Sequence, residues 1–507
     1  MQRQPEDGCP GADGMIVFFN PLSTSPGKQP LPLSIMALAA VLEGHHAWAL
    51  VDGNLEPDPA QSILARIDAA PGDGTPLVAV SVMPGPRLTQ AVEVCRALRV
   101  ARPSLKIVWG GYFPTLHTDT VMHSSIVDFV VRSQGEQPLL ELIDALRGGR
   151  PLETVGSLSW KQADGTVVHN ARAPMTTLDE LPPFPYGRVD MERYIHRTYV
   201  GSRTIAHNSS FGCPFSCSFC AVVEMTHRRW LAQSPTRVYQ TLAHLRDAYR
   251  VDSVLMHDMD FFISEARVAE IAERIAPLGM RWWALGRIDT LMRYSTRTFN
   301  AMARSGLKMV FSGAETSSAE TLAAMNKGGT SSPDLALELA ARMKQYGIVP
   351  EYSFVLGAPP DPEGDTIKTF DFIRRIKAVN PATEIILYTY TPVPGDGLLP
   401  AEATRRGFTF PQTLDEWASD AWRQTMLRRG DQIPWMPDGF KRRVRNFERV
   451  LNAFYPTVTD PRLTPARRAL LRMVSAWRYA LRVYAAPYEL QAMQRLLHYQ
   501  RPETTGF

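Results

Sequence analysis

The sequence has few cysteines, no long apolar run and no excess of either sign of charge. Its 507 residues include five cysteines, whereas a secreted disulfide framework needs an even and dispersed set. No apolar run approaches the roughly 18 residues that span a bilayer, and the polar start has no secretory h-region. Basic and acidic residues number 55 and 51, which argues against a nucleic-acid partner. These absences favour a cytoplasmic protein without a transmembrane segment.

The first half of the chain has the pattern of an α/β domain. Residues 1–13 are polar and rich in Gly and Pro, and we expect them to be disordered. Over residues 14–150, helical patterns separate apolar runs at 15–20, 48–52, 77–82, 107–109 and 126–131. Strands that alternate with helices predict a parallel, flavodoxin-like doubly wound sheet. A ligand of such a domain binds beyond the carboxyl ends of the strands.

A second α/β region follows a predicted linker at residues 151–198, which holds a short hairpin and the Pro-rich stretch Leu181–Pro185. From 199 to 400, strands are predicted at 204–210, 253–257, 281–285, 309–313, 352–356 and 384–389. Six such units predict a partial (β/α)6 barrel of the TIM type. Residues 401–507 read as a helical, basic and aromatic region. We interpret it as a lid or packing element, with a membrane-binding or apolar-substrate surface as the alternative.

Three of the five cysteines, Cys213, Cys217 and Cys220, lie within eight residues directly after the first predicted barrel strand. Thiolates are the ligands of iron–sulfur clusters, and Cys-x3-Cys-x2-Cys can hold three corners of a 4Fe-4S cube. The fourth iron then has no protein ligand and can bind a substrate or cofactor. Structural zinc is the weaker reading, because it needs a fourth ligand, for which only His227 is near. With Cys9 and Cys95 alone left over, a second cluster is not expected.

The motif Cys-x3-Cys-x-Phe-Cys at the end of a first barrel strand resembles that of the radical-SAM family. The resemblance implies a 4Fe-4S cluster whose open iron binds S-adenosylmethionine (SAM), which is split into a 5′-deoxyadenosyl radical. It also implies SAM contacts by Phe219, Asp258, Asp260, Arg287, Glu315 and Ser353. The family's Gly-Gly-Glu is absent, so either aspartate could face the methionine ammonium. Tyr390 opens a matching segment after the sixth strand and is assigned, with the three cysteines, to the catalytic group.

The N-terminal domain resembles the cobalamin-binding domain that is fused to many radical-SAM enzymes. The resemblance covers the strand ends, where glycine lets a backbone approach a large flat cofactor. It implies contacts to cobalamin by Asn20, Ser81, Val82, Met83, Gly85, Gly110, Gly111, Tyr112, Gly135 and Glu136. An empty or nucleotide-binding domain is the alternative, although the dinucleotide fingerprint Gly-x-Gly-x-x-Gly is missing.

One feature of cobalamin domains is absent. No histidine has an aspartate two residues before it, so the motif Asp-x-His-x-x-Gly does not occur. We therefore expect the lower face of the cobalt to lie over the loop from Ser81 to Arg87, without a histidine ligand.

The resemblance implies a methyltransferase that uses the deoxyadenosyl radical and methylcobalamin to methylate an unactivated carbon. The alternative is a ring-forming or oxidative enzyme with the same cofactors, acting on a tetrapyrrole or a hopanoid-type lipid. A non-catalytic sensor is disfavoured, since it has no use for an open iron. We expect a small-molecule substrate, apolar in one reading, and an electron donor such as flavodoxin or ferredoxin. The sequence does not identify the substrate or the oligomeric state.

Overall fold

The computed structural model describes residues 14–24, 27–70, 74–327, 332–426, 432–460 and 463–497. The segment 1–13, predicted to be disordered, lies outside the described residues. The chain divides into two compact units. The first consists of Met1–Tyr194, Glu224–Thr226 and Phe410–Arg423, and the second of Ile195–Val223, His227–Thr409 and Gln424–Phe507.

The first unit is built on one seven-stranded sheet with the order β2-β1-β3-β4-β5-β6-β7. Its parallel strands are β1 (Ile16–Asn20), β2 (Trp48–Asp52), β3 (Leu77–Ser81), β4 (Lys106–Gly110) and β5 (Phe129–Val131). The hairpin β6 (Leu158–Lys161) and β7 (Val167–His169) continues the sheet in antiparallel pairing. The hairpin therefore belongs to the first sheet, whereas the sequence predicts it as part of the linker at residues 151–198.

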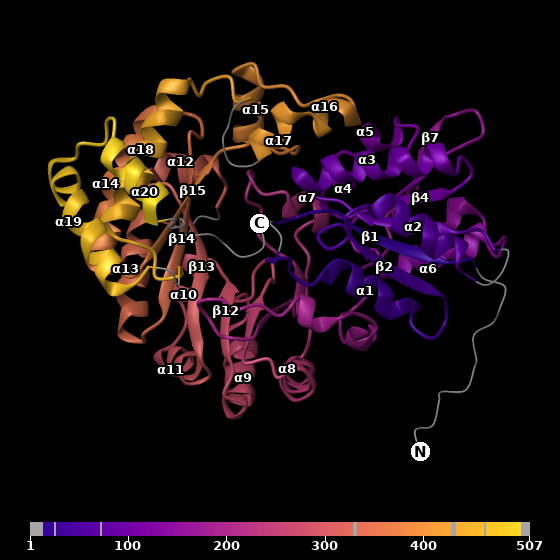
Figure 1. Ribbon diagram of the computed structural model, residues 1–507, viewed down its shortest axis with the longest axis horizontal. Coiled ribbons are helices and arrows are strands. Elements are labelled where there is room, and N and C mark those ends of the chain that lie inside the picture. The colour runs from indigo at the N-terminus through magenta and orange to yellow at the C-terminus, as the bar shows by residue number, and fades with distance from the viewer. Residues whose placement is uncertain are drawn as a thin grey trace. The chain divides into compact units, whose positions relative to one another are not determined.

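Helices cover both faces of this sheet (Figure 1). Helices α1 (Leu33–Leu42) and α6 (Glu136–Leu146) pack on one face, where Ile35, Leu139 and Leu142 join a buried core with strand residues. Helices α2 (Pro59–Asp68) and α3 (Pro86–Ala101) lie on the other face. With both faces covered, the strands are almost continuously apolar, as parallel sheets require.

The second unit contains an open six-stranded sheet with the order β15-β14-β13-β12-β11-β8, all parallel. Its strands are β8 (Thr204–His207), β11 (Ser253–Met256), β12 (Arg281–Leu285), β13 (Leu307–Glu315), β14 (Val349–Leu356) and β15 (Glu384–Thr389). The predicted partial barrel is confirmed, because successive strands are neighbours in space. Their carboxyl ends meet at one rim, where a barrel of this type carries its chemistry.

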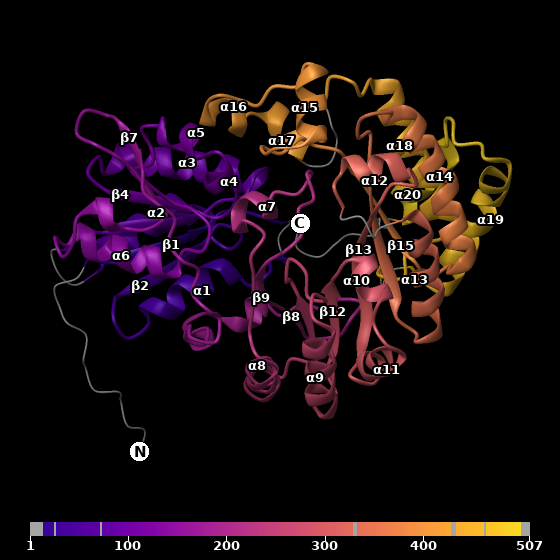
Figure 2. The same cartoon turned by 180° about the vertical axis from the view of Figure 1, so that it is seen from behind.

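Helices α8 (Pro235–Tyr249), α9 (Glu265–Ile275), α11 (Thr296–Arg304), α13 (Pro333–Gln345) and α14 (Pro362–Val379) surround the outside of this sheet (Figure 2). Local sequence explains where they begin. In α8, the Ser234 side chain accepts from the backbone N–H of Arg237 at 3.3 Å, and Pro235 occupies the first turn. Val238, Leu242 and Leu245 of α8 then point into the core.

The C-terminal helices do not form one body. Helix α16 (Leu414–Ala418) belongs to the first unit, where Trp417 packs against Phe113 and His117 with ring centroids 5.2 and 4.5 Å apart. Helices α18 (Asp438–Phe454), α19 (Pro465–Leu481) and α20 (Tyr488–Leu497) belong to the second unit. Phe447 of α18 stacks on Phe370 of α14, and Arg374 of α14 lies over the ring of Tyr479 in α19.

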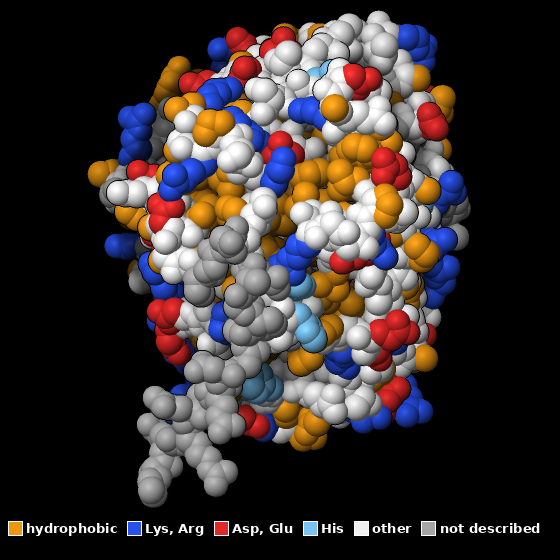
Figure 3. Space-filling view, turned by 90° about the vertical axis from the view of Figure 1, so that its right-hand side faces the viewer, with side chains coloured by type: hydrophobic (Ala, Val, Ile, Leu, Met, Phe, Trp, Pro, Cys, Tyr) orange, Lys and Arg blue, Asp and Glu red, His pale blue; other side chains and the backbone are white. Residues whose placement is uncertain are grey.

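Two surface observations bear on partners. No helix among the described residues is both long enough and apolar enough to cross a bilayer. Basic and acidic side chains are interspersed over the face of the molecule shown in Figure 3.

Candidate active site

The three motif cysteines lie in the loop that follows the short strand β9 (Ser210–Gly212), beyond the carboxyl end of β8. The turn after helix α12 (Ala319–Ala324) holds this loop. Ser218 donates its backbone N–H to Met325 O at 2.9 Å and its hydroxyl to Ala324 O at 3.0 Å. The Asn326 side chain donates to Ser216 O at 3.0 Å. Segments more than a hundred residues apart therefore define the shape of the cysteine loop.

The three sulfurs lie close enough to affect one another. Burial, with smaller contributions from neighbouring cysteines, raises the pKa of the Cys213 thiol to about 12 and that of Cys220 to about 11. Burial also raises the pKa of Cys217. Without metal the thiols hold their protons at neutral pH, so iron binding must displace those protons.

The same thiols are not arranged for a single metal ion. Within the part of the chain that is described, no three His, Cys, Asp or Glu side chains converge on one ion site. A 4Fe-4S cube does not require this, because each thiolate binds a different iron. Three thiolates match three irons of such a cube, whereas structural zinc needs a fourth ligand.

Arg287, which follows β12, contacts the cluster loop directly. One guanidinium nitrogen donates to Cys217 Sγ at 3.2 Å, and two others donate to the Asp289 carboxylate at 2.9 Å each. The guanidinium also lies 3.9 Å from the centre of the Phe215 ring. Arg287 is therefore held by Asp289 and aimed at the cysteines, so a SAM carboxylate would compete for nitrogens that are already bonded.

Glu315, at the carboxyl end of β13, is paired with a residue that the sequence pattern did not single out. Its carboxylate forms a buried ion pair with Lys327, whose ammonium also donates to Gly313 O. Glu315 has a φ of +62°, a strained conformation for a residue with a side chain. A Cβ at Gly313 would overlap the Glu315 carboxylate and the Lys327 ammonium, so a larger residue there would displace this ion pair.

The two aspartates after β11 differ in their partners. Asp258 is fully buried and accepts hydrogen bonds from the backbone N–H and hydroxyl of Ser209 and from the hydroxyl of Ser210. It ties the start of the cysteine loop to β11. Asp260 accepts from Phe262 N at 3.0 Å through one oxygen, while its other oxygen is buried and has no hydrogen-bond partner in the part of the chain that the structure describes. Burial raises the pKa of Asp260 to about 7. Of these two aspartates, Asp260 is therefore the one with a carboxylate oxygen that can accept a hydrogen bond from a ligand.

The remaining predicted residues of the second unit lie on β14 (Ser353), in the cysteine loop (Phe219) and directly after β15 (Tyr390). Ser353 is paired with Gly313 in the sheet and is buried. Phe219 and Tyr390 share an apolar cluster with Met325, Ala358 and Leu399. The Tyr390 hydroxyl is buried and has no hydrogen-bond partner among the described residues. Trp435, which sequence reasoning missed, packs 6.4 Å from the Tyr390 ring and donates to Gly357 O at 2.9 Å.

In the first unit, Asn20 and Asp52 join the ends of β1 and β2. The Asp52 carboxylate accepts from the Asn20 side chain at 3.1 Å, from Asn54 N at 2.9 Å and from the Tyr194 hydroxyl at 3.0 Å. The side-chain amide of Asn20 thus donates a hydrogen bond within this network. Asp52 and Tyr194 were not predicted as site residues, since a single Asp after a strand carries no specific signal.

The predicted residues at the ends of β3 and β4 form one tight surface. Val82 N donates to Gly110 O at 2.9 Å, and the hydroxyls of Ser81 and Ser34 lie 2.9 Å apart. Gly111 has a φ of +96°, and a Cβ there would lie 3.3 Å from Val82 O and 3.4 Å from Ser81 Oγ. Gly85, with a φ of +85°, precedes α3, and Met83 and Tyr112 are partly exposed beside these turns. Such a cradle of small residues can accept a flat cofactor at close range.

Gly135 and Glu136 open helix α6 after β5. A Cβ at Gly135 would lie 3.2 Å from a methyl group of Leu38. Burial raises the pKa of the Glu136 carboxyl, which sits in the first turn of the helix. The predicted cobalamin residues thus lie at the carboxyl ends of the strands of the first sheet. The predicted cluster and SAM residues lie at the carboxyl ends of the strands of the second sheet.

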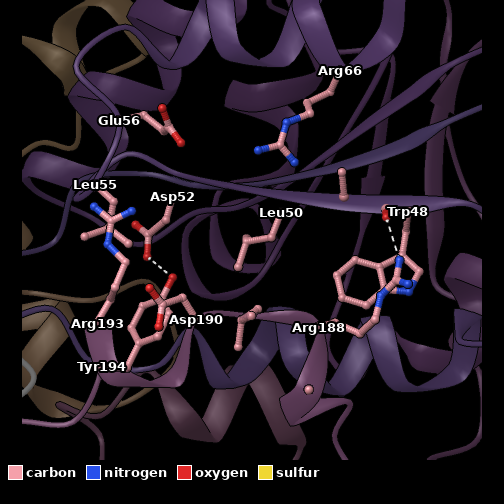
Figure 4. A pocket seen from close by; sticks show the side chains of 13 residues that line it. Trp48, Leu50, Asp52, Leu55, Glu56, Arg66, Arg188, Asp190, Arg193 and Tyr194 are labelled. Atoms are coloured by element: carbon pink, nitrogen blue, oxygen red, sulfur yellow. Dashed lines mark hydrogen bonds between the residues drawn. The ribbon is translucent and has the colours of Figure 1, made fainter. Parts of the chain in front are cut away.

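A separate cavity of about 440 Å³ opens along edge strand β2 of the first unit (Figure 4). Trp48, Leu50, Arg66, residues 187–190 and residues 193–194 are among those that line it, and the Arg188 guanidinium lies 5.0 Å from the centre of a Trp48 ring. None of the predicted cobalamin residues lines this cavity.

Comparison with known proteins agrees with this geometry. Residues 21–143 match the family model of the B12-binding domain, and residues 207–373 match that of the radical-SAM superfamily. The chain is a radical-SAM enzyme with a cobalamin-binding domain. Its cofactors are a 4Fe-4S cluster, SAM and cobalamin, as the sequence predicted.

Three known proteins illustrate the relationship. An uncharacterized methyltransferase of Pyrococcus horikoshii is 27% identical over 349 residues, which cover 68% of this chain and 73% of the relative. The anaerobic magnesium-protoporphyrin IX monomethyl ester cyclase of a Synechocystis strain is 26% identical over 71% of each chain. The structure of OxsB, a cobalamin-dependent SAM radical enzyme, matches with a TM-score of 0.66 at 16% identity. It covers 96% of this chain and 75% of its own. The last match confirms the predicted order of a cobalamin domain, a barrel and a helical region.

Proposed function

We propose that the protein transfers a methyl group to an unactivated carbon of a small molecule. The observation that carries the proposal is made at the rim of the second sheet, which holds three thiols and the Asp260 carboxylate. One oxygen of that carboxylate has no hydrogen-bond partner among the described residues. The same chain also contains a cobalamin-binding domain. The cluster would supply the electron that splits SAM, and cobalamin would carry the methyl group. A relative named as a methyltransferase supports methyl transfer as the reaction.

Within the proposal, each residue acts through its position. Cys213, Cys217 and Cys220 hold three irons, and Asp260 receives the methionine ammonium, because it alone of the two aspartates has an oxygen without a partner. Glu315 and Ser353 line the side of the ribose and adenine, with Phe219 and Tyr390 closing the apolar side. Asn20, Ser81 and the glycines at the strand ends of the first unit bind cobalamin. A flavodoxin or ferredoxin delivers the electron, in a reducing cytoplasmic setting.

The second candidate is ring formation or oxidation with the same cofactors, which the cyclase relative favours. The two are separated by giving the reconstituted holoenzyme SAM with a deuterium-labelled methyl group, together with a small-molecule cell extract and a reductant. Methyl transfer yields a labelled product together with S-adenosylhomocysteine. If 5′-deoxyadenosine forms while the label is found only in SAM and methionine, with no labelled product and no S-adenosylhomocysteine, the methyl-transfer proposal is wrong and the alternative stands.

A further inference from the structure

Helix α19 presents an unusual outer surface. Leu470, Met473, Trp477 and Leu481 are spaced three, four and four residues apart, which places them on one face of the helix. Their side chains are 42, 70, 49 and 69% exposed. Ala466 and Ala480 on the same face are also exposed. We call these six residues the α19 stripe; it runs for about 20 Å at 1.5 Å per residue.

The stripe is not needed to hold the fold together. The opposite face of α19 supplies the packing, where Leu471 joins a core with Leu463 and Leu497, and Tyr479 stacks on Phe454 of α18. Both ribbon views place α19 on the outside of the second unit (Figures 1 and 2). A row of large apolar side chains left in water on an outer helix indicates a binding surface.

The charges near the stripe are mostly basic. Residues 463–497 contain six arginines and one acidic residue, although the whole chain is close to neutral. Arg467 and Arg472 are exposed on α19, and Arg482, which pairs with Asp371, is exposed just after it. Basic side chains bordering Leu, Met and Trp on one helix are the features of a helix that lies in the plane of a lipid surface.

We propose that the α19 stripe docks the protein onto an anionic lipid bilayer. The apolar side chains enter the boundary between headgroups and acyl chains, and the arginines meet the lipid phosphates. A second copy of the chain is a poorer occupant, because pairing two stripes face to face would bring like-charged arginine rows together. The proposal goes beyond the methyl-transfer function and does not depend on it.

The test is vesicle flotation with the full-length holoenzyme. Vesicles are phosphatidylcholine alone or phosphatidylcholine with one third phosphatidylglycerol. We expect binding to the anionic vesicles, weaker binding at high salt, and a loss of at least about tenfold in the variant Met473→Glu/Leu481→Glu. A matched control, Val100→Glu/Leu398→Glu, changes two equally exposed apolar residues on other helices and should bind as the wild type does.

Three outcomes would overturn the proposal. The wild type fails to bind anionic vesicles, or it binds them no better than the Met473→Glu/Leu481→Glu variant does. In the third, light scattering shows that the wild type self-associates without binding vesicles, and the double variant is monomeric, which assigns the stripe to a second copy. Circular dichroism of each variant checks that it is folded.

Discussion

The Glu315 carboxylate and the Lys327 ammonium form an ion pair in which each side chain is only 6% exposed. The pair connects the carboxyl end of β13 to the turn that also holds the cysteine loop. It therefore links the strained Glu315 backbone to the position of the cluster ligands.

We expect Lys327→Met to destabilise the protein by about 3 kcal/mol, because it leaves a buried carboxylate without its partner. Thermal unfolding of the cluster-free protein measures this directly. The double variant Lys327→Met/Glu315→Gln should recover part of the loss, since the uncompensated charge is then gone. A double variant that is as unstable as the sum of the two single variants would contradict a coupled pair.

Gly111→Ala should weaken cobalamin binding about tenfold or more. The new Cβ would press on Val82 O and Ser81 Oγ, and so would deform the cradle at the ends of β3 and β4. Titration with hydroxocobalamin, followed by corrin absorbance, measures the affinity. Gly148→Ala is the control for placing a side chain at a positive φ, here +80°, with no atom within 4 Å of the new Cβ. Equal weakening in both variants would contradict a role for the cradle.

Replacing any one of Cys213, Cys217 or Cys220 by alanine should abolish the absorbance of the reconstituted cluster and leave corrin binding intact. A three-thiolate cluster has no spare ligand. Cys95→Ala should retain full iron, because Cys95 is buried in the first unit and accepts from Trp109 Nε1 at 3.3 Å. A variant of the triplet that still takes up four irons per chain would be inconsistent with the assignment.

Asp260→Asn and Asp258→Asn should have different effects. Asp260→Asn removes the charge that we assign to the methionine ammonium, so we expect at least tenfold weaker SAM binding by isothermal titration with little change in stability. Asp258→Asn replaces an acceptor of hydrogen bonds from Ser209 and Ser210 by a group that also donates, and should lower stability by about 2 kcal/mol. Reversal of the two phenotypes would exchange the roles of the aspartates.

The stability of the first unit should fall in mild acid because of His117. Burial among Phe113, Phe410 and Trp417 lowers the pKa of His117 to about 4. A histidine whose folded pKa is below its unfolded pKa contributes stability that is present above about pH 6.5 and is lost as the pH falls towards 4. His117→Phe should flatten this decline, by about 3 kcal/mol at pH 4, in urea unfolding at a series of pH values. A pH profile as steep in His117→Phe as in the wild type would contradict this role of His117.

The sequence by itself determined the cofactors and the order of the two sheets. The spacing of Cys213, Cys217 and Cys220 is a local property, because a loop of eight residues carries all three ligands. Strands such as Trp48–Asp52, Arg281–Leu285 and Glu384–Thr389 were predicted with their observed bounds, since a strand buried on both faces is a short apolar run between helices.

Only the tertiary structure decided which polar side chains near the rim form hydrogen bonds or ion pairs within the protein. Asp258 and Asp260 are two residues apart and look alike in sequence. Asp258 accepts hydrogen bonds from Ser209 and Ser210, whereas one oxygen of Asp260 has no hydrogen-bond partner among the described residues. Lys327 and Asp289 were not predicted, because each acquires its meaning from a partner brought close by folding. Local spacing identifies ligands within a loop, whereas burial, ion pairing and the hydrogen bonds that use up a side chain arise only when distant strands and helices meet.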